Sequence, residues 1–395
     1  MSHVRTPQPK SRPEWLKSVR GALIATVAVC VVLLAFAWPT ATSRVENLPV
    51  TVVGLQEQVD AVTQKMPEYL LELHPMASRE DVVNGIKSRE VYGGIVLGEQ
   101  PEILTASAAS PVASQMLTGV RTNMQRGIDQ QVIAGMQQAL QKMASGGAAP
   151  GGAGAPGQNG GAASDGAASG GAASGGAAQA QRGAGAQQAP GAPGATPPTV
   201  KVTDVVPLSD DDPRGSGLAI AGLPLTMGGM IGGVLISLLV TGVRKHLLAI
   251  ALYGVLGGLA LAGILQGVFG ILQANYFANA AATGLGIAAT ASVIVGLNSL
   301  IGRPGIAVGA VLTMFIGNPI SALTQPKEFI LPPFGEIGQW LVPGLSGTVL
   351  RDLSYFPEAN IAGQIWALIG WLALGVILTV LGHHKNESAL RSAEG

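Results

Sequence analysis

The chain carries little charge. Only 12% of its 395 residues are Asp, Glu, Lys or Arg, against about 25% in an ordinary soluble domain. The 23 basic residues are matched by 23 acidic residues, so the formal net charge is zero. Proteins that bind nucleic acid need surplus Lys and Arg to neutralise phosphates. We therefore expect no nucleic-acid partner, and the shortage of charge argues against a soluble enzyme.

Cysteine and the common catalytic motifs are also scarce. The one cysteine, Cys30, lies inside an apolar run, which excludes an internal disulfide and a cysteine-built metal site. The chain has no Gly-x-x-x-x-Gly-Lys-Ser/Thr loop for nucleotide phosphates and no Gly-x-Ser-x-Gly nucleophile motif. The acidic triplet Asp210, Asp211 and Asp212 is more typical of a solvated turn than of a cation site. We expect no cofactor, no metal and no enzymatic activity.

Long uncharged apolar runs are the most prominent feature of the sequence. A membrane-spanning helix needs about 20 such residues, and the sequence predicts a polytopic α-helical membrane protein with six transmembrane helices, one followed by five. The predicted spans are residues 21–39, 218–243, 247–269, 282–301, 304–323 and 361–382. The first run could instead be a cleaved signal peptide, but its 18 residues from Gly21 to Trp38 exceed the usual signal core of about 7–15 residues.

Basic residues predict the orientation of these helices. The tails 1–20 and 383–395, the pair Arg244 and Lys245, and Arg303 all fall on one side when six helices alternate. Lys and Arg near helix ends stay on the cytoplasmic side. We therefore expect both termini in the cytoplasm and residues 40–217 outside. The Gly- and Ala-rich composition suggests the plasma membrane of a bacterium with a GC-rich genome.

Residues 40–143 read as a small α/β exterior domain followed by a long helix. Short apolar runs begin near Val50, Leu70, Val91 and Ile103, and helical patterns lie between them, in the order β-α-β-α-β-β. Ser78, with Asp81 three positions later, predicts a helix start.

The long amphipathic helix is predicted from about residue 111 to 143. Apolar residues recur every four positions, and the stripe consists of Val112, Met116, Val120, Met124, Ile128, Val132, Met136 and Leu140. Because an α-helix has 3.6 residues per turn, such a stripe winds around it. We expect this face to pack on the α/β domain or on the same helix of a second copy, in preference to forming a Met-lined groove for an apolar ligand.

Residues 144–198 contain 17 Gly and 19 Ala, with Asp165 and Arg182 as the only charges, and repeat Gly-Ala-Ala-Ser three times. Such a segment lacks the large apolar side chains that offset chain entropy. We expect a disordered exterior tether or insertion here. Residues 199–217 then resume order and return the chain to the membrane.

Glycines recur at four-residue spacing inside the predicted spans. They are Gly228, Gly229, Gly232, Gly233, Gly254, Gly257 and Gly258. Glycine faces let helices approach closely in lipid. Two interpretations stay open, namely a subunit interface or sliding surface for transport, and static packing within one bundle. No Asp, Glu, Lys or Arg lies deep in any predicted span, which argues against proton- or ion-coupled transport.

The exterior loop 324–360 interleaves prolines with aromatic residues. It contains Trp340, Pro343, Arg351 and Tyr355, and it is too apolar for an ordinary loop. We expect two short helices that dip into the outer leaflet, with Trp and Tyr at the level of the lipid headgroups.

One span, an exterior domain and then five spans form an arrangement that resembles the ABC-2-type membrane proteins. The similarity is to the phage-infection-protein-like branch, which has a large exterior domain after the first transmembrane helix. The similar stretches are Asn47–Val53, Val83–Ile86, Val91–Leu97, Pro207–Leu208, Asp212–Gly215, Leu341–Gly344 and Leu350–Arg351.

The resemblance implies a homodimer or pseudo-dimer of six-helix units that exports an amphipathic, lipidic or cell-envelope component, with a separate ATPase docked from the cytoplasm. The connection after the second span is little more than Val243 to His246, which leaves almost no room for a helix that an ATPase would grip. The possible ATPase contacts are Trp15, Lys17, Arg244 and Lys245. The alternative is a non-transporting envelope scaffold that recruits partners through its exterior domain.

Overall fold

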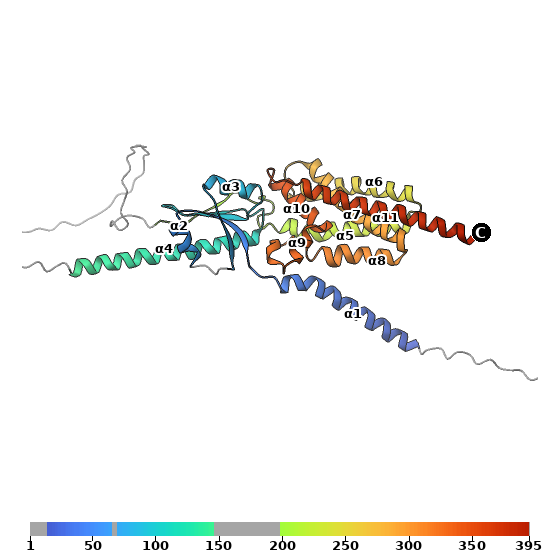
Figure 1. Cartoon of the computed structure of the whole chain (residues 1–395), viewed down its shortest axis with the longest axis horizontal. Helices are drawn as coiled ribbons and strands as arrows, with labels where there is room; N and C mark the ends of the chain where they lie inside the picture. The colour runs from blue at the N-terminus through green and yellow to red at the C-terminus, as the bar shows by residue number, and fades with distance from the viewer. Residues whose placement is uncertain (1–13, 65–68, 146–197, 395) are drawn as a thin grey trace, which may run out of the picture. The chain divides into compact units, whose positions relative to one another are not determined.

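The computed structural model describes residues 14–64, 69–145 and 198–394. The chain divides into two compact units, one of residues 1–122 with 200–395 and one of residues 123–199. Residues 1–13 of the predicted cytoplasmic tail and 146–197 of the Gly/Ala-rich segment lie outside the described residues. The first unit contains a mixed sheet and a bundle of long helices (Figure 1).

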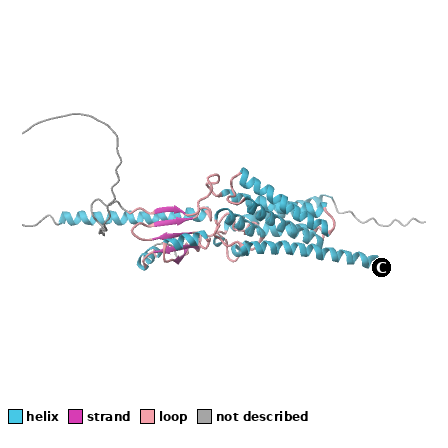
Figure 2. Ribbon diagram, turned by 90° about the horizontal axis from the view of Figure 1, so that it is seen from above, coloured by secondary structure: helices cyan, strands magenta, loops and turns pink. Residues whose placement is uncertain are grey.

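Five strands form one sheet in the order β2-β1-β3-β4-β5 (Figure 2). The strands are β1 (Leu48–Val53), β2 (Leu71–Pro75), β3 (Gly93–Val96), β4 (Glu102–Thr105) and β5 (Lys201–Asp204). Helix α2 (Gln56–Thr63) connects β1 to β2, and α3 (Arg79–Lys87) connects β2 to β3. The predicted order β-α-β-α-β-β is present. The Ser78 side chain accepts a hydrogen bond from the Asp81 N–H, as expected of a helix N-cap.

The fifth strand had no counterpart in the sequence prediction. β5 pairs in parallel with β4, with Ile103 opposite Val202, although about a hundred residues separate them in the chain. Three of its four residues are exposed, so the segment lacks the apolar signal of a buried strand. Pairing with β4 places this strand at the edge of the sheet.

Two neighbouring glycines in β3 allow helices to pack close to the sheet. A Cβ atom on Gly94 would overlap the Val82 side chain of α3, and one on Gly93 would overlap Leu117 of α4 (Pro111–Ser145). Val82, Ile86 and Leu117 are fully buried as a result. The sheet therefore has a core that includes side chains from both helices.

Helix α4 matches the predicted range, and it matches the predicted packing face in part. Among its buried residues in the first unit, Val120 belongs to the expected stripe and Ala113 and Leu117 do not, whereas Val112 of the stripe is 40% exposed. A step of four residues drifts around a helix, so the stripe leaves the packed face. Further along α4, Ile133, Met136 and Leu140 are exposed.

Helices make up the rest of the first unit. They are α1 (Glu14–Ala41), α5 (Ser216–Leu239), α6 (Val243–Ala262), η1 (Gly263–Val268), α7 (Tyr276–Ile301), α8 (Pro304–Ala310), η2 (Val311–Gly317), η3 (Lys327–Phe329), α9 (Phe334–Gln339), α10 (Val342–Tyr355) and α11 (Ala362–Glu394). Segments η1 and η2 are π-helical continuations of α6 and α8, and η3 is a 3-10 turn.

Among the described residues, four helices are long and apolar enough to cross a membrane. They are residues Ala221–Leu239, Val243–Val268, Tyr276–Ile301 and Ala362–Lys385. Two further apolar helical stretches in the described part of the chain are shorter, Val29–Pro39 and Pro304–Gly317. The predicted span 304–323 is thus helical only as far as Gly317, and the predicted span 282–301 begins earlier, at Tyr276.

Helix α7 is the centre of the bundle. In its apolar stretch 83% of the residues are buried, against 22–28% in α5, α6 and α11. It packs against α5, α6, α8, α10 and α11. The other three long helices therefore leave most of their residues at least partly exposed, as lipid-facing helices would.

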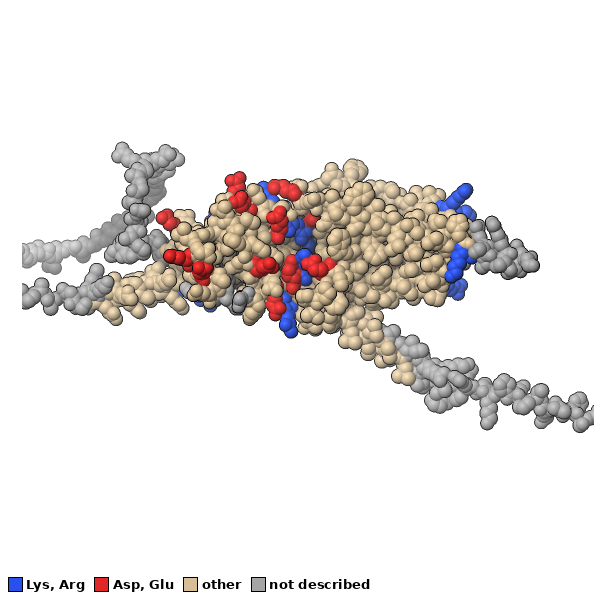
Figure 3. Space-filling view, in the orientation of Figure 1, with Lys and Arg blue, Asp and Glu red and all other residues tan. Residues whose placement is uncertain are grey.

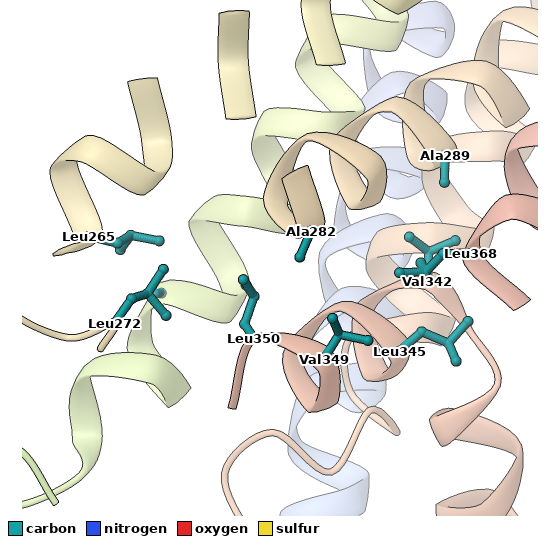
Figure 4. Packing of buried hydrophobic residues seen from close by; sticks show 10 residues of the cluster. Leu265, Leu272, Ala282, Ala289, Val342, Leu345, Val349, Leu350 and Leu368 are labelled. Carbon is teal, nitrogen blue, oxygen red and sulfur yellow. The ribbon is translucent and has the colours of Figure 1, made fainter. Parts of the chain in front are cut away.

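Helix α10 lies in the core of the bundle. Val342, Leu345, Val349 and Leu350 are buried with Ala282 and Ala289 of α7 and Leu368 of α11 (Figure 4). We expected short helices dipping into lipid, whereas the apolar face of α10 is covered by other helices. Further along the chain, Phe356 is buried in the sheet core with Val82 and Ile86. The segment from Val342 to Phe356 therefore contributes side chains to the core of the bundle and to the core of the sheet.

Charged residues avoid the middle of the bundle surface that Figure 3 shows. Lys and Arg gather at one end of the helices, and acidic and basic side chains mix where the sheet region begins. Such an uncharged band between polar ends is what a lipid bilayer requires of a protein surface.

Candidate functional site

An open cavity of about 730 Å³ lies where the sheet region meets the bundle. Its walls come from the turn after α3, the segment 322–328, helices α9 and α10, and the start of α11. Both sides of the cavity belong to the first unit. We take this cavity as the candidate site, because it is large enough for a small molecule or a lipid headgroup.

Arg89 reaches the site because of an unusual helix end. The Arg89 N–H donates to the Ile86 carbonyl and the Glu90 N–H to the Gly85 carbonyl, which is the Schellman arrangement of a helix C-terminus. The residue at Arg89's position in that motif is usually glycine, since its backbone is left-handed, and here φ is 62°. Arg89 therefore holds a backbone conformation that a β-carbon disfavours.

The Arg89 side chain pairs with Asp352 of α10. Its guanidinium also lies 5.3 Å from the centre of the Phe356 ring. Asp352 is 4% exposed, and burial raises the pKa of its carboxyl while Arg89 opposes that shift. This ion pair connects the sheet to the bundle across 263 positions of sequence.

Arg351 is the second guanidinium on the cavity wall. Its Nη2 donates to the Leu323 carbonyl at 2.9 Å. No ion pair with a carboxylate within 4 Å is found for Arg351 among the described residues. Burial, and then repulsion from Arg89, lower the pKa of Arg351 to about 10.

Tyr92 and Glu328 form a hydrogen-bonded pair that also lines the cavity. The Tyr92 hydroxyl donates to Glu328 Oε2 at 3.2 Å. Burial raises the pKa of both side chains. Nearby, Lys327 pairs with Glu336 at 2.7 Å. Glu328 and Glu336, like Asp352, therefore already have donors within the chain.

The structure brings together two of the four predicted loop residues. Trp340 and Arg351 line the cavity, and Trp340 is 61% exposed. Pro343 is buried in the bundle beside Gly317. The Tyr355 hydroxyl donates to the Ile271 carbonyl at 3.0 Å, so that side chain connects α10 to the turn before α7.

A second, much smaller cavity of about 20 Å³ lies inside the bundle. Hydroxyl groups line it, from Thr226, Thr283, Thr290 and Ser346. Thr283 Oγ1 and Ser346 Oγ are buried without a hydrogen-bond partner. A space of this size has room for one water molecule, and it is too small for a substrate.

The seven predicted glycines lie at contacts between helices of this chain. Gly228 and Gly232 of α5 face Tyr253 of α6, whose hydroxyl donates to the Gly228 carbonyl at 2.6 Å. Gly229 and Gly233 face α7, as do Gly254, Gly257 and Gly258 of α6. Their placement corresponds to packing within one bundle.

The glycine contacts between α7 and α11 were missed in the sequence. A Cβ atom on Gly296 would meet the carbonyl of Gly375, and one on Gly382 would meet the backbone of Ser299. Gly375 and Gly382 are seven residues apart, two helical turns, and this spacing was the available signal.

The possible ATPase contacts lie at two places. Trp15 and Lys17 belong to the start of α1, where only the backbone is described. Arg244 and Lys245 are exposed in the first turn of α6. Helix α5 ends at Leu239 and α6 begins at Val243, so three residues connect them.

No group of three or more potential metal ligands occurs among the residues that the structure describes. In the acidic triplet, Asp212 Oδ2 accepts a hydrogen bond from the Gly217 N–H at 2.7 Å, at the start of α5. That carboxylate is therefore used to hold a helix terminus.

Comparisons of the chain with protein-family models, with curated proteins and with solved structures give no match. The site must therefore be interpreted from its own geometry. The residues that sequence analysis did not single out for it are Arg89 and Glu328, and the ion pair of Arg89 joins segments that are distant in the chain.

Proposed function

We propose that this chain is the membrane subunit of an ABC-2-type exporter that moves a lipidic or cell-envelope component outward. The observation that carries the proposal is the cavity of about 730 Å³ at one end of membrane-length helices. Its wall combines guanidinium and carboxylate groups with the exposed indole of Trp340. A polar pocket beside an apolar surface suits an amphipathic substrate.

We propose six membrane spans for the chain. Helix α1 and the continuous α8–η2 segment add two spans to the four long apolar helices. Helices α9 and α10 then form a re-entrant element between η2 and α11. This order agrees with the ABC-2 resemblance, in which short exterior helices precede the last span.

The orientation follows from the ends of the helices. When the helices are followed along the chain, the ends that lie away from the sheet are the ones that carry Arg244, Lys245, Arg303 and Lys385. By the positive-inside rule those ends face the cytoplasm of a bacterial plasma membrane. The sheet and the cavity are then exterior, and both chain termini are cytoplasmic.

We also propose that the working unit is a homodimer. Helix α1 leaves Val31, Leu33 and Leu34 more than half exposed, so its apolar face has room for lipid or for a second copy. Because the seven predicted glycines are used within one bundle, the contact between copies must use other surfaces, such as α1.

A non-transporting envelope scaffold is the second candidate. The three-residue connection from Val240 to Gly242 favours it, because an ATPase that drives an exporter needs a cytoplasmic element to hold. In this alternative the bundle anchors the exterior sheet, which recruits partners.

An ATPase assay separates the two candidates. The full-length chain is co-expressed with each ATPase encoded beside it and purified in mild detergent. The exporter predicts a stable complex, stimulated ATP hydrolysis, and loss of both in the Arg244→Gln, Lys245→Gln double variant. No stable complex, together with no export defect on deletion of the gene, would refute the exporter.

Cysteine labelling tests the six spans and their orientation. Cys30 is the only native cysteine, so Cys30→Ser gives a cysteine-free background. Single cysteines at the exposed positions Glu57 and Thr241 are treated in intact cells with a membrane-impermeant maleimide. We expect labelling at position 57 and none at 241, and the reverse pattern would overturn the orientation.

A further inference from the structure

Arg351 lines the cavity, and its guanidinium forms no ion pair within the part of the chain that the structure describes. Its carboxylate neighbour in sequence, Asp352, is engaged by Arg89. The hydrogen bond from Arg351 to the protein that the structure gives is the one to the Leu323 carbonyl. Because a guanidinium has five N–H donors in a planar fork, most of its donors are left for another partner.

A guanidinium in this position matches an oxyanion. Withdrawing a cation from water is costly unless an anion accompanies it, and the buried carboxylate beside Arg351, that of Asp352, is already paired with Arg89. Phosphate and carboxylate groups bind such a fork through two parallel hydrogen bonds. The site therefore has the charge and the donor geometry for an anionic group.

The acidic residues around the cavity do not supply the anion that Arg351 lacks. Asp352 pairs with Arg89, Glu336 pairs with Lys327, and Glu328 accepts from Tyr92. Glu90 also lines the cavity, but its side chain is exposed to solvent. Three of the four acidic residues are thus engaged elsewhere, and Arg351 keeps its free donors.

An apolar surface continues outward from the cavity. Helix α9 exposes Ile337 and Trp340, by 46% and 61%, and Trp366 of α11 is 71% exposed. The Trp371 indole N–H donates to the Trp340 carbonyl at 2.9 Å, which holds α9 against α11. A ligand whose anionic end reaches Arg351 can therefore lay an apolar chain along these helices.

We propose that the cavity binds the anionic headgroup of an amphiphile, with Arg351 as the residue that holds its phosphate. This inference rests on the proposed membrane role of the chain and names the class of substrate that the site receives. Its test measures binding alone, so it needs no ATPase.

The experiment uses the full-length protein in dodecyl maltoside and titration calorimetry. The probes are dihexanoyl phosphatidylglycerol, dihexanoyl phosphatidylcholine and inorganic phosphate. We expect saturable binding of the phosphatidylglycerol, weaker binding of the zwitterionic lipid, and no binding of phosphate alone at the same concentrations. Equal affinity for phosphate alone would overturn the amphiphile assignment.

Variants at Arg351 test its role. A hydrogen bond to a charged group contributes about 1.5–3 kcal/mol, so Arg351→Gln should weaken phosphatidylglycerol binding at least about tenfold. Arg351→Lys keeps the charge and should retain part of the affinity. Unchanged affinity in Arg351→Gln would overturn the proposal.

A second pair of variants tests the cavity without touching a charge. Gly363 lines the cavity, and a Cβ atom there meets no heavy atom within 4 Å. Gly370 is its matched control, two turns further along α11 and equally free of contacts. Gly363→Phe should abolish binding and Gly370→Phe should preserve it, and equal binding by both variants would refute the site.

The outcomes separate this inference from the proposed function. Loss of an ATPase complex with lipid binding intact would refute the exporter and keep the site. Unchanged lipid binding in Arg351→Gln and Gly363→Phe, with an ATPase complex present, would refute the site and keep the exporter.

Discussion

The sheet region and the helical bundle are packed in different ways. The sheet core buries large side chains, including Leu48, Ile95 and Ile103. The central helix of the bundle buries small residues, such as Gly284, Ala291 and Ser292. Burial of apolar area from water drives the first kind of core, whereas close backbone approach stabilises helices in lipid, where no water is displaced. The two regions should therefore fail under opposite substitutions.

Removing volume should damage the sheet most. Leu104 of β4 is fully buried, and Leu55 is 72% exposed. Leu104→Ala should lower the free energy of unfolding by about 2–5 kcal/mol, because transfer and cavity costs add, and Leu55→Ala by less than about 0.5 kcal/mol. Hydrogen exchange of the β3 and β4 amides in the detergent-solubilised protein measures both. Equal effects would contradict the assigned core.

Adding volume should damage the bundle, by a somewhat smaller amount. A Cβ atom on Gly258 would overlap the Ala280 carbonyl and the Gly284 backbone, whereas one on Gly257 would meet the flexible end of Ile287 at 2.6 Å. We expect Gly258→Ala to destabilise the bundle by about 1–3 kcal/mol and Gly257→Ala clearly less. Thermal unfolding in detergent, followed by circular dichroism, compares the neighbours, and a larger loss in Gly257→Ala would contradict the α6–α7 contact.

The ion pair between Arg79 and Glu102 also stabilises the sheet, and we expect it to contribute about 2 kcal/mol to the free energy of unfolding. The Arg79 guanidinium, 2.6 Å from Glu102 Oε2, lowers the pKa of Glu102 from 4.5 to about 2, although burial opposes the shift. Because folding lowers this pKa, the pair stabilises the fold above pH 4.5, and that stabilisation is lost as the pH falls toward 2.

Glu102→Gln should therefore destabilise β5 at pH 7 by about 2 kcal/mol. Hydrogen exchange of residues Lys201–Asp204, whose strand pairs with β4, is the measurement. The difference between the variant and the native chain should shrink as the pH falls through this range. Glu72→Gln, at a side chain that is 58% exposed, is the control and should change nothing.

The smallest expected effect concerns the junction between the two regions. Arg89→Ala loses the ion pair with Asp352 and keeps the left-handed backbone, while Arg89→Gly loses the same ion pair and relieves the backbone. We expect Arg89→Gly to be the more stable variant by about 1 kcal/mol. Chemical unfolding of both variants provides the comparison, and the opposite order would refute the strain at this position.

Local signals in the sequence predicted much of the sheet region. The hydroxyl of Ser78 and the short apolar runs act within a few residues, so helix α3 and the first four strands follow from nearby sequence. Strand β5 could not be predicted in this way. Its residues are mostly exposed, and it becomes a strand through pairing with a segment about a hundred residues earlier.

The candidate site was predicted only in part for the same reason. Trp340 and Arg351 stood out as an aromatic and a basic residue in an apolar loop. Arg89 gave no such signal, because its role depends on the backbone at the end of α3 and on Asp352 far along the chain. The burial of α10 could not be predicted either, because an apolar helix has the same sequence pattern whether lipid or another helix covers it.

The short link between α5 and α6 has a mechanical consequence. Three residues span at most about 11 Å, and the Tyr253 hydroxyl fastens the two helices again at the Gly228 carbonyl. We therefore expect α5 and α6 to move together as one rigid unit. Any rearrangement of the bundle must pivot at its other joints, such as the segment from Gly302 to Pro304 between α7 and α8.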